Sequence, residues 1–516
     1  MAIPAIMLRR RAEPDGMALL DGSSRLSWTE CADQVTRAAR RLLELAPAPE
    51  ERVAIVGDNA IPTLVAHLAG IAAGVGTVAV TRQLTGSEMA RQFTDARVVA
   101  AITGPAGAAA TREAGRRARL RAVVVHGTDA ADGEVTWKGW LASAAGRGTA
   151  TWAAEARPAR PPLVYTSGTT GRARGTEVRW TDQVPATAAE YVDAIARSAA
   201  FPPGPHLVAG PLSHNGPLSC LRHLIAGEPV IVMERFDAES FLRLVAEHRA
   251  ASSLMVPTHF QRLLALPEPL RARYDVSSLR QVAHTGSACP PAVKRAMIDW
   301  FGPVLVESYG ASEVGTVARI SSPEWLERPG SVGRARQPFE ALVVDDSGTP
   351  LPAGEVGLLA FRSPDERGVR YHADPEKTRA AYLAPGVFTL GDVGYVDADG
   401  YLFITDRAAD MVVSGGVNLY PAESEAVLLR HAGVGQVAVI GVPDPDFGES
   451  LHALVVARGA PPDPGELDAF CRSQIAAYKC PKSYEFVPEL ARNAMDKLDK
   501  RALRRRYWDS ERTIAG

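Results

Sequence analysis

Residues 163–178, LVYTSGTTGRARGTEV, are the stretch from which the organisation of the chain is predicted. Its apolar start, Leu163 to Tyr165, predicts the end of a buried strand. The block that follows has little side-chain bulk and consists of Thr166, Ser167, Gly168, Thr169, Thr170 and Gly171. Small residues let backbone N–H groups approach a ligand, and hydroxyls add rotatable donors. Because a strand precedes the block and Arg172 and Arg174 follow it, we interpret it as a phosphate-binding loop, not as a flexible Ser/Thr/Gly linker.

This loop resembles the signature loop of the AMP-forming acyl-adenylate superfamily. The superfamily comprises acyl-CoA synthetases, carrier-protein adenylation domains and beetle-type luciferases. The loop differs from the GxxxxGK[ST] nucleotide loop because no Lys-Ser or Lys-Thr closes it. Where the superfamily usually has Pro-Lys-Gly, this chain has Ala173-Arg174-Gly175. Arg174 keeps the positive charge and offers a planar fork suited to phosphate.

The composition is that of a globular protein with more than one domain. A chain of 516 residues is too long for one core. A net charge of −2 gives no basic field for nucleic acid, and no apolar stretch is long enough to span a bilayer. The five cysteines have no paired or CxxC spacing, and the N-terminal residues do not have the pattern of a signal peptide. We therefore expect a soluble cytoplasmic protein with free thiols and no nucleic-acid partner; the sequence does not indicate its oligomeric state.

Strands and helices alternate along the chain, which predicts an α/β fold with a mostly parallel sheet. Expected helices cover 28–45, 59–74, 87–96, 181–200 and 238–247, and expected strands cover 52–56, 77–80, 98–102 and 121–125. Residues 104–119 and 126–160 are expected to form surface helix and loop. The predicted architecture is a large N-terminal domain of mixed, mostly parallel sheets covered by helices, with a small mobile C-terminal α+β domain.

The predicted boundary lies at Asp406–Asp410 and separates a nucleotide- and acyl-binding domain, 1–406, from a lid domain, 407–516. Asp399-Gly400, between two short apolar runs, predicts a hairpin just before this boundary. Residues 411–420, MVVSGGVNLY, predict a second hairpin after it. The second hairpin resembles the one that lines the pantetheine tunnel in the superfamily, which assigns Ser414, Gly415 and Gly416 to coenzyme A.

Two segments resemble the acyl side of acyl-CoA synthetases. The run PLSHNGP at 211–217 resembles a segment whose His or aromatic side chain borders the acyl and pantetheine channels, which makes His214 a candidate catalytic residue. The run at 251–261, ASSLMVPTHFQ, resembles the turn that lines the acyl pocket. By resemblance, both favour an extended or polycyclic apolar carboxylate as substrate.

Two further segments carry the candidate nucleotide site. QVAHTGSACPP at 281–291 resembles the adenine-side loop of fatty-acid and bile-acid CoA ligases and assigns Gly286, Ser287 and Ala288 to the nucleotide. LVESYGASEVG at 305–315 resembles the Tyr-Gly-x-Thr/Ser-Glu motif, with candidate nucleotide residues Ser308, Tyr309, Gly310 and Ser312. Tyr309 offers a flat face for adenine, and Glu313 is a hard oxygen ligand suited to Mg²⁺.

The remaining candidates lie toward the C-terminus. The Gly-Asp pair that ends at Asp392 resembles the ribose-binding pair of the superfamily, with Arg407 as its basic companion and Ile404 on the nucleotide side. Lys497, in NAMDKLDKR, matches the C-terminal catalytic lysine motif. The resemblance implies that Lys497, Glu313, Thr166 and His214 serve catalysis, with ATP, Mg²⁺ and coenzyme A as cofactors or cosubstrates.

The chain departs from the superfamily pattern at Ala173, at Ala409 in the hinge position, and at Asp496, where Gly usually precedes the lysine. An acidic neighbour offsets part of the positive field of Lys497. All three departures bear on adenylation or on the domain movement toward it, whereas the coenzyme A hairpin matches the pattern.

The resemblance implies an acyl-CoA ligase that acts through an acyl-AMP intermediate. Three alternatives stay open: an enzyme that only forms the thioester from supplied acyl-AMP, a stand-alone adenylating enzyme that loads a carrier protein, and a non-catalytic nucleotide-binding protein. The identity of the acid is not indicated by the sequence.

Overall fold

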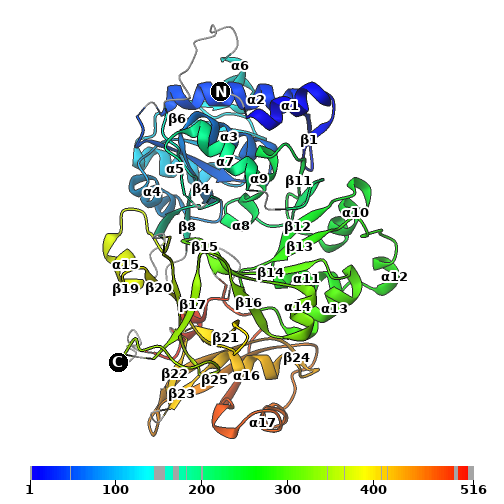
Figure 1. The fold of residues 1–516 in the computed structure, drawn as a ribbon, viewed down its shortest axis with the longest axis vertical. Coiled ribbons are helices and arrows are strands. Elements are labelled where there is room, and N and C mark those ends of the chain that lie inside the picture. The colour runs from blue at the N-terminus through cyan, green and yellow to red at the C-terminus, as the bar shows by residue number, and fades with distance from the viewer. Residues whose placement is uncertain are drawn as a thin grey trace. The chain divides into compact units, whose positions relative to one another are not determined.

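The computed structural model describes residues 3–46, 48–144, 157–166, 174–181, 183–198, 201–345, 347–364, 367–407, 410–414, 417–492 and 498–508. The chain divides into two compact units (Figure 1). Unit 1 comprises Met1–Arg336 with Asp365–Ala380, and unit 2 comprises Gln337–Pro364 with Ala381–Gly516. Both units combine sheets and helices, so the predicted α/β class is confirmed. The finer prediction of a mobile domain that begins at residue 407 remains a prediction.

One sheet of unit 1 has the strand order β7-β6-β5-β3-β4-β8-β9. Its strands are β3 (Arg52–Gly57), β4 (Gly76–Thr81), β5 (Val98–Thr103), β6 (Ala122–Val125), β7 (Glu134–Thr136), β8 (Leu163–Thr166) and β9 (Arg174–Glu177). Neighbours pair in parallel except for β8 and β9, which are antiparallel. This pairing places Thr166 opposite Arg174, at the two ends of the predicted phosphate loop.

Side chains of β3 alternate between the two faces of this sheet, and each face has its own core. Val53 and Ile55 lie in the cluster formed with α2 (Trp28–Leu45) and α3 (Ile61–Ala73). Ala54 and Val56 lie in the cluster formed with α4 (Gly86–Asp95) and α5 (Ala108–Ala118). Helices therefore cover both faces, as expected for a buried parallel sheet.

The second sheet of unit 1 has the order β16-β15-β14-β13-β12-β10-β11-β1-β2. Its strands are β1 (Met17–Leu20), β2 (Arg25–Ser27), β10 (His206–Val208), β11 (Val230–Val232), β12 (Ser252–Met255), β13 (Gln281–His284), β14 (Leu305–Ala311), β15 (Gly315–Ser321) and β16 (Ser331–Ala335). The run from β14 to β1 is parallel, so the carboxyl ends of β10, β12, β13 and β14 lie along one edge. The associated helices are α8 (Asn215–Leu218), α9 (Cys220–Ile225), α10 (Ala238–His248), α11 (Pro257–Leu264), α12 (Glu268–Arg271), α13 (Pro291–Phe301) and α14 (Ser322–Glu327).

Two local predictions differ from the structure in detail. The helix expected at 181–200 is present as α7 (Ala188–Arg197), and it begins later because Thr187 accepts a hydrogen bond from the backbone of Glu190 and the Glu190 side chain returns one in a capping box. Residues 126–160 belong to the segments expected to form surface helix and loop, and they contain β7 and α6 (Trp137–Ala142). Trp137 and Trp140 of α6 are buried, and this apolar area explains why the segment joins the core.

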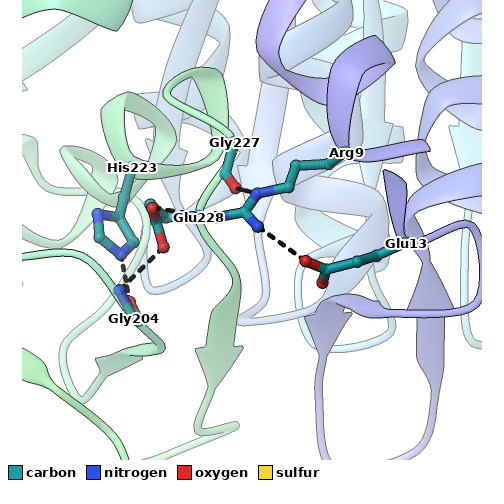
Figure 2. A network of polar contacts seen from close by, with 6 residues as sticks. All are labelled: Arg9, Glu13, Gly204, His223, Gly227 and Glu228. Carbon is teal, nitrogen blue, oxygen red and sulfur yellow. Dashed lines mark hydrogen bonds and ion pairs between the residues drawn. The ribbon is translucent and has the colours of Figure 1, made fainter. Parts of the chain in front are cut away.

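The N-terminal helix, α1 (Pro4–Ala12), is held by a polar network (Figure 2). Arg9 Nε donates to the carbonyl oxygen of Gly227 at 2.9 Å, and its guanidinium also pairs with Glu228. Glu228 accepts from the backbone N–H of Gly204, whose carbonyl accepts from Nε2 of His223 at 2.6 Å. The network joins segments that are far apart in the sequence, since Arg9 and Gly227 are separated by 218 positions.

The described strands of unit 2 fall into two hydrogen-bonded groups. One has the order β17-β18-β20-β21 with β19 paired to β20, and the other has the order β23-β22-β25-β24 with β26 paired to β25. Their strands are β17 (Glu340–Val344), β18 (Gly357–Arg362), β19 (Tyr382–Ala384), β20 (Val387–Val396), β21 (Tyr401–Arg407), β22 (Val412–Ser414), β23 (Val417–Leu419), β24 (Val434–Asp444), β25 (Gly448–Ala457) and β26 (Ser483–Phe486). Its helices are α16 (Pro421–Leu428), α17 (Pro464–Arg472), a 3₁₀ turn (Ala477–Lys479) and α18 (Lys500–Arg504). Both predicted hairpins are present as the antiparallel pairs β20–β21 and β22–β23.

Two ion pairs fasten α18 within unit 2. Lys500 Nζ lies 2.7 Å from Glu425 of α16, and Arg504 donates to Asp410 at 2.8 Å. All four side chains are mostly covered, with exposures between 11% and 19%. The last described helix is therefore tied to the segment that follows β21.

Across the described ranges, no helix is long and apolar enough to cross a membrane. The five cysteines are free, as predicted; four are buried and Cys289 is half-buried. Cys471 and Cys480 nevertheless contact one another in the core of unit 2, a proximity that their spacing does not indicate.

Candidate active site

The carboxyl edges of the two sheets of unit 1 meet at Thr166 and Glu313. Thr166 is the last residue of β8, and Glu313 lies in the turn between β14 and β15. The Thr166 hydroxyl donates to Oε1 of Glu313 at 3.1 Å, across 147 positions of sequence. The structure thus brings together the predicted phosphate-side hydroxyl and the predicted metal-binding carboxylate.

Gly310 makes the turn that carries Glu313 possible. β14 and β15 pair with a register shift between Tyr309 and Gly310. A Cβ atom at position 310 would lie 2.0 Å from the carbonyl oxygen of Gly315, which is backbone and cannot rotate away. Only glycine therefore permits this approach of the two strands.

Tyr371 is a second neighbour of Glu313 that the sequence analysis missed. Its phenol lies near enough to the Glu313 carboxylate for the two groups to interact electrostatically. Burial and, next, the negative charge of Glu313 raise the pKa of Tyr371 to about 12. The phenol therefore keeps its proton at neutral pH.

Arg174, predicted to face phosphate, forms an ion pair with Asp374. Arg174 Nε lies 2.8 Å from Oδ2 of Asp374, with side-chain exposures of 17% and 32%. The pKa of Asp374 is lowered first by the hydrogen bond from the backbone of Lys377 and next by Arg174. Asp374 directly precedes α15 (Pro375–Ala380). The Asp-Pro pair at the start of α15 is a sequence signal for the beginning of a helix. The pairing itself spans 200 positions and has no local signal.

Gly175 lets the segment 370–374 approach β9 closely. The backbone N–H of His372 donates to the carbonyl oxygen of Gly175 at 2.7 Å. A Cβ atom at position 175 would lie 3.2 Å from Cβ of His372 and 3.3 Å from Tyr165 and Leu163 atoms, which is tighter than ordinary packing. Close packing against His372, Tyr165 and Leu163 thus explains why a glycine, Gly175, stands at the end of the predicted loop.

The predicted adenine-side residues lie on neighbouring parallel strands. Gly286, with φ of +93°, Ser287 and Ala288 follow β13 and are exposed. Ser308, Tyr309 and Gly310 lie toward the end of β14 and are half-buried, as is Ser312 in the turn that follows. His284 and Glu307 are register partners in the two strands, so the two groups of predicted residues lie at the same edge.

A buried ion pair lies directly behind this edge. Lys294 Nζ of α13 is 2.5 Å from Oε2 of Glu307, and the side chains are 0% and 9% exposed. Burial raises the pKa of Glu307, while the Lys294 ammonium opposes that shift. His284 Nε2 lies 3.7 Å from the same carboxylate oxygen, and burial keeps the pKa of His284 well below its usual range.

His214 lies at the carboxyl edge of the same sheet, after β10. It is half-buried and occupies the N-cap position of α8. Its predicted place beside acyl and pantetheine channels remains a prediction.

The predicted ribose and coenzyme A residues belong to unit 2. Asp392 is 6% exposed, and its Cα is the register partner of Arg407 across β20 and β21. Ile404 pairs with Gly394 in the same hairpin, and Ser414 ends β22. The backbones of Asp392 and Arg407 are thus paired across this hairpin.

Some predicted positions lie outside the described residues. They are Ser167, Gly168, Thr169, Thr170, Gly171, Ala173, Ala409, Gly415, Gly416, Asp496 and Lys497.

The Glu313 environment fits Mg²⁺. Mg²⁺ prefers oxygen ligands and is usually held by one or two carboxylates together with substrate phosphates and water. Glu313 supplies a half-buried carboxylate, and the Thr166 hydroxyl oxygen lies 3.1 Å from it. Within the described ranges, no three or more His, Cys, Asp or Glu residues gather as a metal cage. The Glu313 carboxylate and the Thr166 hydroxyl therefore suit a cation that is also bound by the phosphates of a nucleotide.

The α/β architecture and the hydroxyl–carboxylate contact at the sheet edges indicate a nucleotide-dependent enzyme. The chain belongs to the AMP-binding enzyme family: the model of that family matches residues 8–368, and the model of its C-terminal domain matches residues 423–497.

Named relatives agree with this assignment. The chain is 36% identical to the 7a-methyl-1,5-dioxo-octahydro-1H-inden-4-yl-propanoyl:CoA ligase of Mycobacterium tuberculosis, over 97% of this chain and 98% of that protein. An amide bond synthetase from Marinactinospora thermotolerans has a similar structure, with a TM-score of 0.81, 28% identity and coverage of 98% and 100%. The o-succinylbenzoate CoA synthetase of Bacillus subtilis, in complex with its acyl-adenylate, has a TM-score of 0.79, 25% identity and coverage of 97% of each chain.

Proposed function

We propose that this chain is an acyl-CoA ligase that converts a carboxylic acid to its coenzyme A thioester through an acyl-AMP intermediate. In the first half-reaction, the carboxylate oxygen attacks the α-phosphorus of ATP and pyrophosphate leaves. In the second, the coenzyme A sulfur attacks the acyl carbon, AMP leaves and the thiol proton passes to solvent. The observation that carries the proposal is the contact of Thr166 with Glu313 at the meeting of two sheet edges.

The residues act by positioning and by charge stabilisation, without an enzyme nucleophile. Thr166 and the following loop bind phosphate, and Tyr309 with residues 286–288 binds adenine. Asp392 and Arg407 hold the ribose side, and Lys497 stabilises the charge that develops during adenylation. When bound at Glu313, Mg²⁺ would neutralise charge on the phosphate oxygens.

His214 and the segment 251–261 set the acid preference. The predicted extended or polycyclic apolar acid is supported by the M. tuberculosis relative, whose name specifies a ring-bearing propanoyl group. We therefore infer a ring-bearing or extended apolar carboxylate as the substrate class, with coenzyme A as the acceptor at Ser414.

The test follows each half-reaction separately. Purified protein is incubated with ATP, Mg²⁺ and a panel of acids, and pyrophosphate, AMP and acyl-CoA are measured. The proposal expects all three products to appear together with an apolar ring-bearing acid. Release of AMP without any thioester, when coenzyme A is present, would contradict coenzyme A as the acceptor and favour a carrier protein or amine.

A second candidate retains only thioester formation from supplied acyl-AMP. The observation that favours it is the Arg174–Asp374 ion pair, because Asp374 already compensates the charge that the loop would offer to the outer phosphates. The sequence also departs from the superfamily pattern at Ala173, Ala409 and Asp496, three positions that bear on adenylation. Exchange of labelled pyrophosphate into ATP, measured beside thioester formation from synthetic acyl-AMP, separates the two. Robust exchange at a comparable rate would rule the second candidate out.

A further inference from the structure

A connected set of polar side chains in unit 2, the Ser483 network, consists of Ser483, His452, Tyr507 and Glu485. Ser483 is the first residue of β26, and its hydroxyl lies 2.7 Å from Nδ1 of His452 in β25. The other ring nitrogen of His452, Nε2, lies 3.1 Å from the hydroxyl oxygen of Tyr507, which donates to the carboxylate of Glu485. Ser483 is exposed, whereas only 7% of His452 is exposed. The network therefore connects a solvent-facing hydroxyl to a covered imidazole.

The register of two strands explains why these groups meet. β25 and β26 are parallel, and His452 and Ser483 are register partners. Glu485 follows Ser483 by two positions, so both side chains lie on the same face of β26. Tyr507 belongs to the segment after α18, and its ring centroid lies 4.9 Å from that of His452. Residues from separate segments thus converge on one imidazole.

The hydrogen bonds determine where the protons of the Ser483 network lie. Tyr507 donates its one hydroxyl proton to Glu485, so its oxygen accepts from Nε2–H of His452. Nδ1 of His452 is then unprotonated and accepts from the Ser483 hydroxyl. Burial lowers the pKa of His452, and burial followed by the bond to Glu485 raises the pKa of Tyr507 to about 12. The pKa of Glu485 is lowered, first by the hydrogen bond from Tyr507, so the network ends at an ionised carboxylate.

We propose that Ser483 is a nucleophile that accepts an acyl group from an acyl-adenylate, with His452 as its base. A serine hydroxyl becomes a competent nucleophile when a base lies within hydrogen-bond reach and a further group orients that base. His452 satisfies the first condition, and Tyr507 with Glu485 satisfies the second. The inference goes beyond the proposed function, on which only the natural source of the acyl donor rests.

The reaction needs no reactant besides the acyl-adenylate. The Ser483 oxygen forms a bond to the acyl carbon, the bond from that carbon to the phosphate oxygen breaks, and AMP leaves. The hydroxyl proton passes to Nδ1 of His452, which becomes an imidazolium. The carboxylate of Glu485, whose Oε2 lies 3.7 Å from Nε2, stabilises this cation until the proton passes to solvent. The product is an ester on Ser483.

Accessibility distinguishes Ser483 from another serine that contacts a histidine. His206 Nδ1 lies 2.9 Å from the Ser252 hydroxyl, but the two residues are 1% and 0% exposed, so no acyl donor reaches them. A purely structural role is the alternative for the Ser483 network, because Tyr507 also fastens the segment after α18 to β25. That role predicts a loss of stability when the network is broken and an unreactive Ser483 in the parent protein.

The first measurement uses the full-length protein without ATP or coenzyme A, so its result does not depend on the ligase reaction. A fluorophosphonate probe is added, and peptide mass spectrometry follows the modification of individual serines. Ser473 is an internal control, because it is an exposed serine of the same unit whose hydroxyl donates at 2.7 Å to the carbonyl oxygen of Phe470, which takes up no proton. We expect Ser483 to react about 100-fold faster than Ser473, as for a hydroxyl beside a positioned base. Equal rates would overturn the proposal.

Two variants test the base and the charge behind it. We expect His452→Gln to reduce the reaction rate of Ser483 to that of Ser473, and Glu485→Gln to reduce it about tenfold. Thermal unfolding checks that each variant is folded. Because Glu485→Gln keeps an amide oxygen that accepts from Tyr507, it remains informative if His452→Gln does not fold. Parent-like reactivity of Ser483 in a folded variant of either kind would show that the network does not activate the serine.

The second measurement offers synthetic acyl-AMP and acyl-CoA in separate reactions. We expect acyl-AMP to add the mass of the acyl group to the peptide that contains Ser483, and fragmentation to place this mass on Ser483 and not on the neighbouring amine of Lys482. The Ser483→Ala variant is expected to lack the modification. Modification by acyl-CoA alone would overturn the adenylate as donor. Reaction with the fluorophosphonate but with neither acyl donor would overturn the acyl-accepting role and leave the proposed function unaffected.

Discussion

Lys294 places its ammonium nitrogen 2.5 Å from the Glu307 carboxylate, and the lysine side chain has no exposed surface. Removing only one partner would leave an uncompensated charge in the interior. We expect Lys294→Met to lower the free energy of unfolding by about 3–5 kcal/mol, the usual cost of breaking a buried pair.

The double variant Lys294→Met/Glu307→Gln is expected to recover much of that loss, because no buried charge remains. Denaturant unfolding measures both, with Arg243→Met as control, since Arg243 and Glu247 form a pair with exposures of 53% and 55%. A single Lys294 variant as stable as the parent would show that the pair is not needed for folding.

The Arg504–Asp410 pair gives a second prediction for unit 2. Arg504→Gln removes a charge-assisted bond of 2.8 Å between largely covered side chains. We expect a loss of about 1–3 kcal/mol, less than for a fully buried pair because both side chains keep some contact with water. Hydrogen exchange of peptides that cover α18 provides the local measurement. Unchanged protection of α18 would contradict the anchoring role of this pair.

His67 makes unit 1 sensitive to acid. Its Nδ1 lies 2.8 Å from the Thr77 hydroxyl, its side chain is fully buried, and burial lowers the pKa of His67 to about 3. Above about pH 6.5, the pKa of histidine in the unfolded chain, His67 is neutral in both the folded and the unfolded state, so its protonation takes nothing from the stability. Below it, only the unfolded chain gains the proton, so stability falls by about 1.4 kcal/mol per pH unit until the folded pKa is reached.

His67→Gln is therefore expected to flatten the pH dependence of unfolding between about pH 6.5 and the acid limit. The variant has a different absolute stability, so the comparison is one of slopes. Parent and variant are expected to share one slope between about pH 7 and 8, where His67 is neutral in both states. Equal slopes below about pH 6 would refute the assignment.

Arg174 tests the phosphate side of the site. Arg174→Ala removes a cation whose charged hydrogen bonds are each worth about 1.5–3 kcal/mol, so we expect ATP affinity to fall about 10- to 100-fold. Thioester formation from synthetic acyl-AMP is expected to remain, because acyl-AMP has no outer phosphates. Competition binding with ATP and AMP measures the difference, and Arg243→Ala is the remote control. Equal losses for ATP and AMP would place Arg174 away from the outer phosphates.

Gly310 tests the turn that carries Glu313. The added Cβ of Gly310→Ala would contact a backbone oxygen at 2.0 Å, so the strands must separate. We expect a stability loss of about 1–3 kcal/mol and a weaker Mg²⁺ dependence of ATP binding. Gly22→Ala is the control, because a Cβ at position 22 meets no atom within 4 Å. Parent-like Mg²⁺ dependence in the Gly310→Ala variant would show that Glu313 tolerates the shift.

Much of the fold was predictable because its signals are local. The helix predicted at 28–45 is α2, whose capping box at Ser27 and Glu30 and apolar spacing both lie within the segment. The strand expected at 98–102 is β5 for a similar reason, a short apolar run that follows a polar helix end. Trp137 and Trp140 were assigned to a surface segment because the surrounding Ala, Gly and Thr conceal a short helix.

Motif resemblance named candidate site residues, but not the contacts between them. Thr166 and Glu313 were both named from sequence, but their contact depends on how two separate sheets meet. Tyr371 and Asp374 were missed because their partners lie far away in the sequence and their own segment has no apolar periodicity. Long-range polar pairing of this kind has no signature in composition or spacing.

The raised pKa of all five native thiols has a practical consequence for measuring motion. Burial raises the pKa of Cys31, Cys289 and Cys471 to about 12, and it also raises the pKa of Cys220 and Cys480. Because the thiolate is the reactive form, maleimide dyes should leave the native chain almost unmodified at neutral pH. One engineered surface cysteine in each unit would then carry a fluorophore without removing any wild-type residue from the core. Single-molecule energy transfer between the two dyes would report directly whether ATP, acyl-AMP and coenzyme A each select a different distance.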